Sequence, residues 1–303
     1  MDASDPLSVP GKRPRSAPRM LAPHLSRDPK AAQQVAEAHR LRLYELIMAA
    51  DLDIRTEELE LHFAGMPLRY WPRVDDATLR WHLDIIHEFI EGLKGSDVML
   101  APPVVRWRQV PERGFSEVVV CTWDSVGLLA KIAGSFAAFG LNIVRADIFT
   151  RADNVVLDVF QVCDKGLRDV QDISRLKQME QLLRVALGPA SAGDVVLHTW
   201  MRYASEPAAA DVAKVARAPV VALDNEQSDE YTVLEIQATD RVGLLHDILK
   251  AVSAGDVDIA HAIVVTEEGE AADVFFLTGT DGKKISDAKR LEQIRSGVLA
   301  ALD

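Results

Sequence analysis

Thr122-Trp123-Asp124-Ser125-Val126-Gly127-Leu128-Leu129 and Thr239-Asp240-Arg241-Val242-Gly243-Leu244-Leu245 are two copies of one motif, with Gly243 following Gly127 by 116 residues. Each copy follows an apolar run typical of a strand and opens a run with helical spacing. At the same offset, Phe139-Gly140-Leu141-Asn142-Ile143 aligns with Gly255-Asp256-Val257-Asp258-Ile259. A repeat of this length predicts two copies of one small domain.

The composition limits the class of protein. A chain of 303 residues supports two to three domains of roughly 150 residues each. Its 34 Lys and Arg against 46 Asp and Glu give a net charge of −12, which argues against a nucleic-acid partner, because nucleic-acid-binding domains are usually basic. Cys121 and Cys163 fall in expected strands and are predicted to be buried, reduced thiols. No apolar run approaches the ~20 residues of a membrane span, and no signal peptide opens the chain, so we expect a cytoplasmic protein without a membrane partner.

The N-terminal third contains two regions of different character. Residues 1–28 combine five prolines with scattered Lys and Arg and predict a flexible basic tail. Residues 29–95 predict a small helical segment that is interrupted at Gly65-Met66-Pro67. Its third helix starts at Asp75 or Asp76 and carries an apolar stripe at helical spacing: Leu79, Leu83, Ile86, Phe89 and Ile90.

The two copies follow as residues 115–225, with an insertion at about 190–218, and residues 230–303. The first has expected strands at Glu117–Thr122, Asn142–Thr150 and Val155–Val162, and expected helices at Gly127–Phe139 and Ile173–Leu187. The second has expected strands at Tyr231–Ala238, Ile259–Thr266 and Asp273–Thr278, and expected helices at Leu244–Ser253 and Ala288–Leu302. Val220–Leu223 is expected to complete a βαββαβ order in the first copy. The second then lacks its last strand, so either the copies share a strand or the second sheet is one strand short.

The repeated motif places an Asp at the end of a strand and a Gly three residues later, at the start of a helix. Free N–H groups of the first helical turn attract a carboxylate, and the Asp is suited to an ammonium group. The alternative is that Asp124 and Asp240 are ordinary helix N-caps and that the glycines serve tight packing. The candidate ligand-binding residues are Asp124, Gly127, Leu128, Asn142 and Ile143 in the first copy, and Asp240, Gly243, Leu244, Asp258 and Ile259 in the second.

The order Asp-x-x-Gly-Leu-Leu, Gly-Leu-Asn-Ile and then a hairpin resembles the ACT domain, a βαββαβ module that commonly binds amino acids and regulates an attached enzyme. Ala146–Thr150, Leu157–Phe160 and Asp273–Phe276 resemble the C-terminal ACT tandem of the family of PII uridylyltransferase/uridylyl-removing enzymes. The stretch His62–Trp71 is similar to the sequence that precedes that tandem. The resemblance covers roughly residues 50–303 outside the insertion. It implies an α+β fold of tandem ferredoxin-like ACT domains preceded by a helical segment.

The catalytic motifs of that family do not appear in this sequence. Its nucleotidyltransferase domain is marked by Gly-Ser and an Asp-x-Asp metal pair, and its phosphohydrolase domain by clustered His and Asp. His62, His82 and His87 form no such pattern and are interpreted as structural or surface residues. Gly279–Lys284 has the wrong spacing for a phosphate-binding loop. The sequence therefore favours no catalytic residue, no metal and no cofactor.

Three hypotheses remain open from the sequence. The leading one is a non-catalytic sensor of a small amino acid, with glutamine as the first candidate, that signals to a regulated protein partner through the helical segment. The second is uridylyltransferase-type activity completed by a separate catalytic chain. The third is a structural protein-interaction module with empty turns. A homodimer is also expected, because the missing last strand leaves a sheet edge for a second copy to cover.

Overall fold

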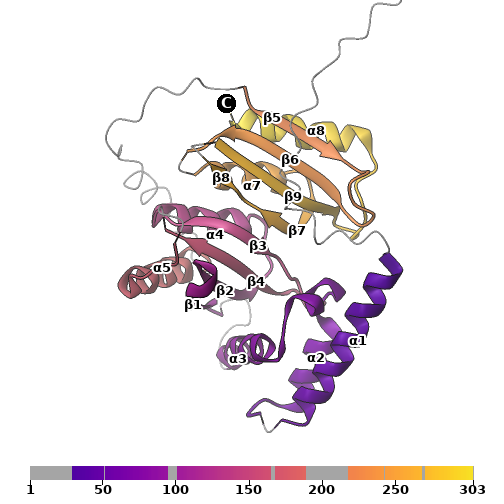
Figure 1. Cartoon of the computed structure of the whole chain (residues 1–303), viewed down its shortest axis with the longest axis vertical. Coiled ribbons are helices and arrows are strands. Elements are labelled where there is room, and N and C mark those ends of the chain that lie inside the picture. Colours follow the sequence, from indigo (N-terminus) through magenta and orange to yellow (C-terminus); the bar gives the residue numbers. More distant parts are fainter. Residues whose placement is uncertain are drawn as a thin grey trace, which may run out of the picture.

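The computed structural model describes residues 29–50, 52–94, 101–164, 168–188, 218–241, 243–267 and 270–302. The expected tail at 1–28 and almost all of the expected insertion at 190–218 lie outside these residues. The element order is helices first, then alternating strands and helices, and it confirms an α+β fold of tandem ferredoxin-like units after a helical segment (Figure 1).

The helical segment comprises α1 (Pro29–Met48), α2 (Thr56–Gly65), the short 3-10 helix η2 (Leu68–Arg73) and α3 (Asp76–Gly92). The carboxylate of Asp75 caps α3 by accepting a 2.8 Å hydrogen bond from the Thr78 N–H, as the sequence predicts for a helix start. Tyr70 and Trp71 of η2 are fully buried and form the centre of this segment's core.

Among the described residues, both copies contribute to one continuous antiparallel sheet of nine strands. The first copy supplies β1 (Val104–Val110), β2 (Phe115–Trp123), β3 (Asn142–Asp147) and β4 (Val155–Cys163). The second supplies β5 (Val220–Asp224), β6 (Thr232–Thr239), β7 (Val257–Ile263), β8 (Thr266–Glu267) and β9 (Glu270–Gly279). The strand order is β1-β2-β4-β3-β7-β9-β6-β5, with β8 paired to β9.

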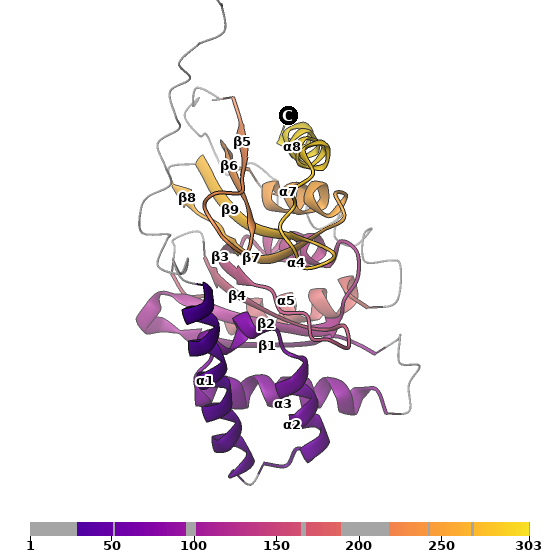
Figure 2. The same ribbon diagram turned by 90° about the vertical axis from the view of Figure 1, so that its right-hand side faces the viewer.

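Four helices cover one face of this sheet (Figure 2). They are α4 (Leu128–Ala138), α5 (Ile173–Ala186), α7 (Leu244–Ser253) and α8 (Ala288–Leu302). One hydrophobic core runs beneath all four and joins Phe136 and Phe160 of the first copy to Ile248 and Phe275 of the second. Both cysteines are buried free thiols, as predicted. Within the described ranges, no helix combines the length and the apolar character needed to cross a membrane.

The fourth strand of each copy precedes the repeat motif instead of ending the copy. In the first copy β1 pairs with β2, and in the second β5 pairs with β6, with Val220 opposite Gln237. The prediction that Val220–Leu223 completes the first copy is therefore wrong, as are both alternatives of a shared or a missing strand. An N-terminal hairpin reaches the same sheet edge as a C-terminal strand would, because both lie next to the first strand of the unit. The edge expected to remain open after Leu302 is filled by β5.

The two copies meet edge to edge at β3 and β7, which pair antiparallel with Arg145 opposite Ile263 and Asp147 opposite His261. Backbone bonds extend this seam at both ends, from the Ile148 N–H to the Ala260 carbonyl at 3.3 Å and from the Val264 N–H to the Val144 carbonyl at 3.2 Å. Helices α4 and α7 pack together above the seam. The two copies therefore share both a sheet and a core.

The helical segment covers the other face of the sheet only in the first copy. There it packs on apolar side chains that include Val119, Cys121 and Leu157. The equivalent positions in the second copy are Glu235, Gln237 and Ala272. These positions are less apolar in the second copy, where Val233, Ile263, Val274 and Phe276 form a smaller, separate apolar cluster on this face.

Candidate functional site

The repeated motif forms a tight turn before α4 and before α7. Gly127 and Gly243 occupy the N-cap positions in the left-handed conformation, with φ of 76° and 83°. An L-residue is strained in this conformation, which explains the glycine at this point of both copies. The N-cap position therefore belongs to the glycines, and the alternative in which Asp124 and Asp240 are the N-caps is not seen. Both Asp residues are exposed.

The antiparallel seam brings Asp258, a predicted site residue of the second copy, next to residues of the first copy. The end of β3 lies beside the start of β7, so Thr150 of the first copy and Asp258 of the second line the same cleft. Burial and the nearby Asp124 carboxylate raise the pKa of Asp258, whereas Arg69 and Arg290 act in the opposite direction. Asp124 of one copy and Asp258 of the other thus belong to one electrostatic group. Asn142 starts β3 at the opposite end of the seam.

Four of the predicted residues are core residues. Leu128, Leu244, Ile143 and Ile259 are at least nine-tenths buried within the shared hydrophobic core. Their side chains hold the turns and the first residues of β3 and β7 against the sheet. Ile259 also borders the cleft through its position next to Asp258.

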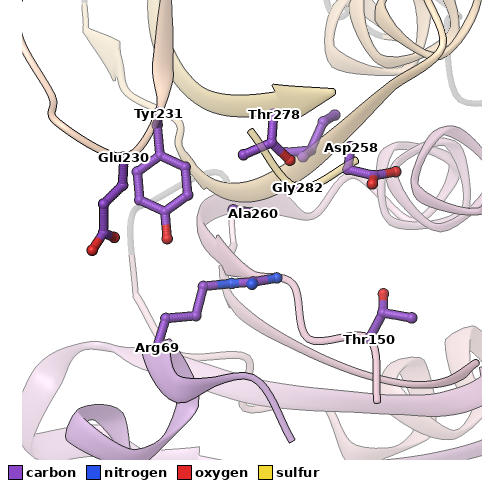
Figure 3. A pocket seen from close by; sticks show the side chains of 9 residues that line it. Arg69, Thr150, Glu230, Tyr231, Asp258, Ala260, Thr278 and Gly282 are labelled. Atoms are coloured by element: carbon purple, nitrogen blue, oxygen red, sulfur yellow. The ribbon is translucent and has the colours of Figure 1, made fainter. Parts of the chain in front are cut away.

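The cleft has a volume of about 460 Å³ and lies where three parts of the molecule meet (Figure 3). The helical segment contributes Arg69, and the hairpin after β3 contributes Thr150. The second copy contributes Glu230 and Tyr231 before β6, Asp258 to Ala260 of β7, Thr278 of β9 and Gly282 of the following turn. Of the ten predicted site residues, Asp258 and Ile259 line this cleft.

Arg69 is the cation of the cleft. Its Nη2 donates a 3.0 Å hydrogen bond to the Ile148 carbonyl, and its guanidinium lies 6.0 Å from the centre of the Phe149 ring. Its Nε is buried and has no hydrogen-bond partner. Figure 3 shows this side chain extending from η2 into the space between Tyr231 and Thr150. A buried N–H group without a hydrogen-bond partner costs free energy, and an acceptor atom of a bound ligand would remove that cost.

The other polar groups of the cleft include two carboxylates and a phenol. Glu230 and Asp258 are both exposed. Burial raises the pKa of Tyr231, with Glu230 adding to the rise and Arg69 opposing it. Arg69 therefore interacts electrostatically both with Tyr231 and with Asp258.

Two buried aspartates repeat at equivalent positions beneath the motif turns. Asp158 of β4 accepts a 3.3 Å hydrogen bond from the Phe149 N–H, and its Oδ2 is buried without a partner. Asp273 of β9 has an unpartnered, buried Oδ1, and burial is the main reason that its pKa rises to about 7. Burial also raises the pKa of Asp158, and the motif Asp of the same copy contributes to the rise in each case.

The sequence analysis did not select Arg69, Tyr231, Asp158 or Asp273 as site residues. Asp158 and Asp273 had a detectable signal, because both interrupt apolar strands at aligned positions of the repeat. Arg69 lies within the quoted His62–Trp71 stretch, but its approach to the second copy depends on tertiary packing.

His62, His82 and His87 of the helical segment lie in two different environments. His62 and His82 are buried, and His82 Nδ1 lies 3.0 Å from the Tyr70 hydroxyl. In the part of the chain that the structure describes, Glu58, His87 and Glu91 bring three potential metal ligands within 4.8 Å of one another. Arg55 pairs with Glu58, and Lys94 pairs with Glu91. These two cations neutralise the carboxylates as the cluster stands.

Comparison with known proteins identifies the repeat. Residues 220–302 match a family model described as an ACR9-like, ACT-like domain. This matched unit begins with β5 and ends with α8, and the first copy has the same strand order. This chain is a tandem ACT-domain protein. Its ACT pair resembles the C-terminal regulatory region of the bifunctional uridylyltransferase/uridylyl-removing enzyme.

Three relatives of this tandem ACT protein carry the name bifunctional uridylyltransferase/uridylyl-removing enzyme. The protein of Gluconobacter oxydans (strain 621H) is 33% identical over 234 residues, which is 77% of this chain and 24% of the relative. The protein of Rhodospirillum rubrum is 31% identical over 248 residues, covering 82% and 25%. The protein of Azospirillum brasilense is 30% identical over 256 residues, covering 82% and 26%. The tandem ACT protein thus spans about a quarter of the length of these relatives, and the matches support a regulatory role.

Proposed function

We propose that this protein is a non-catalytic, cytoplasmic sensor that binds a free amino acid, with glutamine as the first candidate. The observation that carries the proposal is the meeting of charges of both signs in one open cleft between the ACT copies and the helical segment. Asp258 lies at one end of the cleft and Arg69 lies at the other, and Asp124, which does not line the cleft, adds to the negative potential at Asp258. An amino acid is a zwitterion and requires both kinds of charge.

The names of the relatives support the regulatory part of the proposal. The bifunctional uridylyltransferase/uridylyl-removing enzymes carry two opposed activities in one protein, and such enzymes need a signal that selects between them. In our proposal the ACT pair receives this signal, and the helical segment passes it to a regulated protein partner. The contact of Arg69 with both the cleft and the first copy provides a physical connection for this step.

Isothermal titration calorimetry on the purified chain tests the proposal. Glutamine is titrated into the wild type, with other amino acids and nucleotides as controls. We expect saturable heat with glutamine, and we expect Gly127→Val to weaken it, because a β-branched residue is incompatible with φ of 76° in the turn next to Asp124. Gly243→Val makes the same change at the other turn and shows which copy is required.

A chain that gives no heat with any amino acid contradicts the sensor proposal. In that case the motif turns serve the fold alone, and the two Gly→Val variants change stability or assembly without changing any ligand response.

A further inference from the structure

The cleft contains an unusual arginine. Arg69 comes from the helical segment, yet it is the cation among the residues that line a cleft otherwise formed largely by the second ACT copy. Two interactions fix its guanidinium in place, the hydrogen bond to the Ile148 carbonyl and the contact with the Phe149 ring. Its Nε is left buried and unpartnered. A guanidinium held in this way is preorganised to receive a carboxylate through a planar pair of N–H groups.

The opposite wall has the complementary charge. Asp258 lines the cleft with an exposed carboxylate, and Asp124 lies close enough to affect its proton affinity. Thr278 lies on the same wall as Asp258, whereas Thr150 lies on the first-copy side of the cleft, and both add hydroxyl groups. With Asp258 on this wall and Glu230 at the other side, two carboxylates of the cleft lining repel a simple anion. A simple cation is repelled by Arg69.

We infer that the cleft binds the free α-amino-acid zwitterion in one orientation, with its carboxylate on Arg69 and its ammonium group on Asp258. This inference rests on the proposed function and adds to it the residue that recognises the carboxylate. Arg69 belongs to neither ACT copy, so the helical segment is part of the binding site.

This orientation has a regulatory consequence. A ligand held between Arg69 and Asp258 bridges the helical segment and the second copy. The binding free energy of the ligand is therefore linked to the relative position of these two parts. A partner protein that shifts the helical segment changes the affinity for the ligand. The ligand must then change the affinity for that partner by the same factor.

The test pairs two charge-neutralising variants with two altered ligands. Arg69→Gln and Asp258→Asn each remove one charge, and calorimetry is run with L-glutamine, L-glutaminamide and N-acetyl-L-glutamine. Glutaminamide lacks the carboxylate, and N-acetylglutamine lacks the ammonium group. Arg80→Gln is the matched control, because Arg80 lies in the same helical segment and pairs with Asp76 at 3.1 Å but does not line the cleft.

We expect Arg69→Gln to weaken glutamine binding by about 10- to 100-fold, the range for a hydrogen bond to a charged group, and to leave glutaminamide binding unchanged. Asp258→Asn should weaken glutamine binding by a similar factor and leave N-acetylglutamine binding unchanged. Arg80→Gln should bind all three ligands as the wild type does. Melting temperatures are recorded for each variant, and Asp258, being exposed, decides the orientation if Arg69→Gln fails to fold.

Glutamine binding by the wild type that is unaffected in both Arg69→Gln and Asp258→Asn overturns the inference and leaves the proposed sensor intact. Equal weakening of all three ligands in each variant also overturns it, because the variants then act through structure and not through charge recognition. No binding of any amino acid to the wild type overturns the inference and the proposed function together.

Discussion

Asp147 and His261 face each other across the seam between the two ACT copies, with Oδ1 and Nδ1 2.8 Å apart. Arg73 of the helical segment reaches the same carboxylate at 2.9 Å, and Arg145 of the first copy reaches it at 2.9 Å. The His261 ring stacks on Phe276 of the second copy. One buried carboxylate therefore joins the helical segment, the first copy and the second copy.

We predict that Asp147→Ala lowers the free energy of unfolding by roughly 2–4 kcal/mol, because it leaves two arginines without their shared partner in a mostly buried place. Hydrogen bonds and charges from His261 and Arg145 outweigh burial and lower the pKa of Asp147. Its contribution to stability is thus present at neutral pH and is lost as the pH falls through the lowered pKa.

Urea unfolding at neutral pH measures the loss of stability in Asp147→Ala. Glu292→Ala, which removes an exposed pair with Arg295, is the control and should change stability far less, because solvent and salt screen exposed charge pairs. Similar effects of the two substitutions contradict the assigned role.

Asp273 leads to the opposite pH dependence. Burial raises its pKa to about 7 from an ordinary value of 3.8, so the folded protein holds a proton that the unfolded chain releases. The free energy of unfolding should therefore fall as the pH rises from about 4 to 7, and each pKa unit is worth about 1.4 kcal/mol at most. Asp273→Asn resembles the protonated form and should remove this dependence.

Denaturant unfolding at pH 4 and at pH 8 checks this prediction. Wild type and Asp273→Asn should be equally stable at pH 4, and the variant should be more stable at pH 8. A variant that is less stable at both pH values shows that the ionised carboxylate is required by the fold.

The repeat could be recognised in the sequence because a single offset of 116 residues aligns the strands and helices of the two copies. The motif turns, the seam strands β3 and β7 and the helices beside them lie where the sequence predicts them. Strand β1 was missed because Arg106, Trp107, Arg108 and Gln109 resemble a linker between prolines. Their side chains are accommodated by tertiary partners, as Arg108 pairs with Glu117 and lies 4.3 Å from the Trp81 ring centre. Strand β5 was assigned to the wrong copy, because its partner β6 follows it in the chain and the expected order placed it last.

The site was only partly predictable from the sequence, because it depends on contacts between residues that are far apart in the chain. Asp258 was selected from the repeat alone. Arg69 and Tyr231 are separated by more than 150 residues in the sequence and meet only after the helical segment packs on the first copy. No local pattern records a contact of that kind.

Arg175 and Arg290 form a repeated capping device that yields a third prediction. Arg175 of α5 donates from Nε to the Phe139 carbonyl at 2.9 Å and from Nη2 to the Gly140 carbonyl at 3.1 Å, at the end of α4. Arg290 of α8 donates to the Gly255 carbonyl at 3.2 Å and to the Asp256 carbonyl, at the end of α7. Carbonyl groups at a helix C-terminus lack partners within the helix, so these bonds stabilise both helix ends.

Arg175→Met and Arg290→Met should each lower the free energy of unfolding by about 1–3 kcal/mol, the range for losing hydrogen bonds to a charged group. The lysine variants should recover only part of the loss, because lysine lacks the rigid planar fork whose separate N–H groups reach the two carbonyls. Urea unfolding of the four variants is the measurement. Full recovery by lysine at both positions indicates that charge alone matters.

Asp256 provides the fourth prediction, because it stands where the first copy has Gly140. Both residues follow a helix in the left-handed conformation, with φ of 54° for Asp256 and 60° for Gly140. An L-residue is strained there by about 1–2 kcal/mol, and Asp is among the residues that tolerate the strain best. Glycine removes the strain but adds freedom to the unfolded chain, which offsets roughly half of the gain.

Asp256→Gly should therefore raise the free energy of unfolding by about 0.5–1 kcal/mol, and Gly140→Asp should lower it by a similar amount. Asp256→Ala, which keeps the strain and loses the tolerant side chain, should be less stable than the wild type in the same urea titration. A stabilising effect of the alanine variant is incompatible with this account, because it shows that the carboxylate and not the backbone conformation limits stability at this helix end.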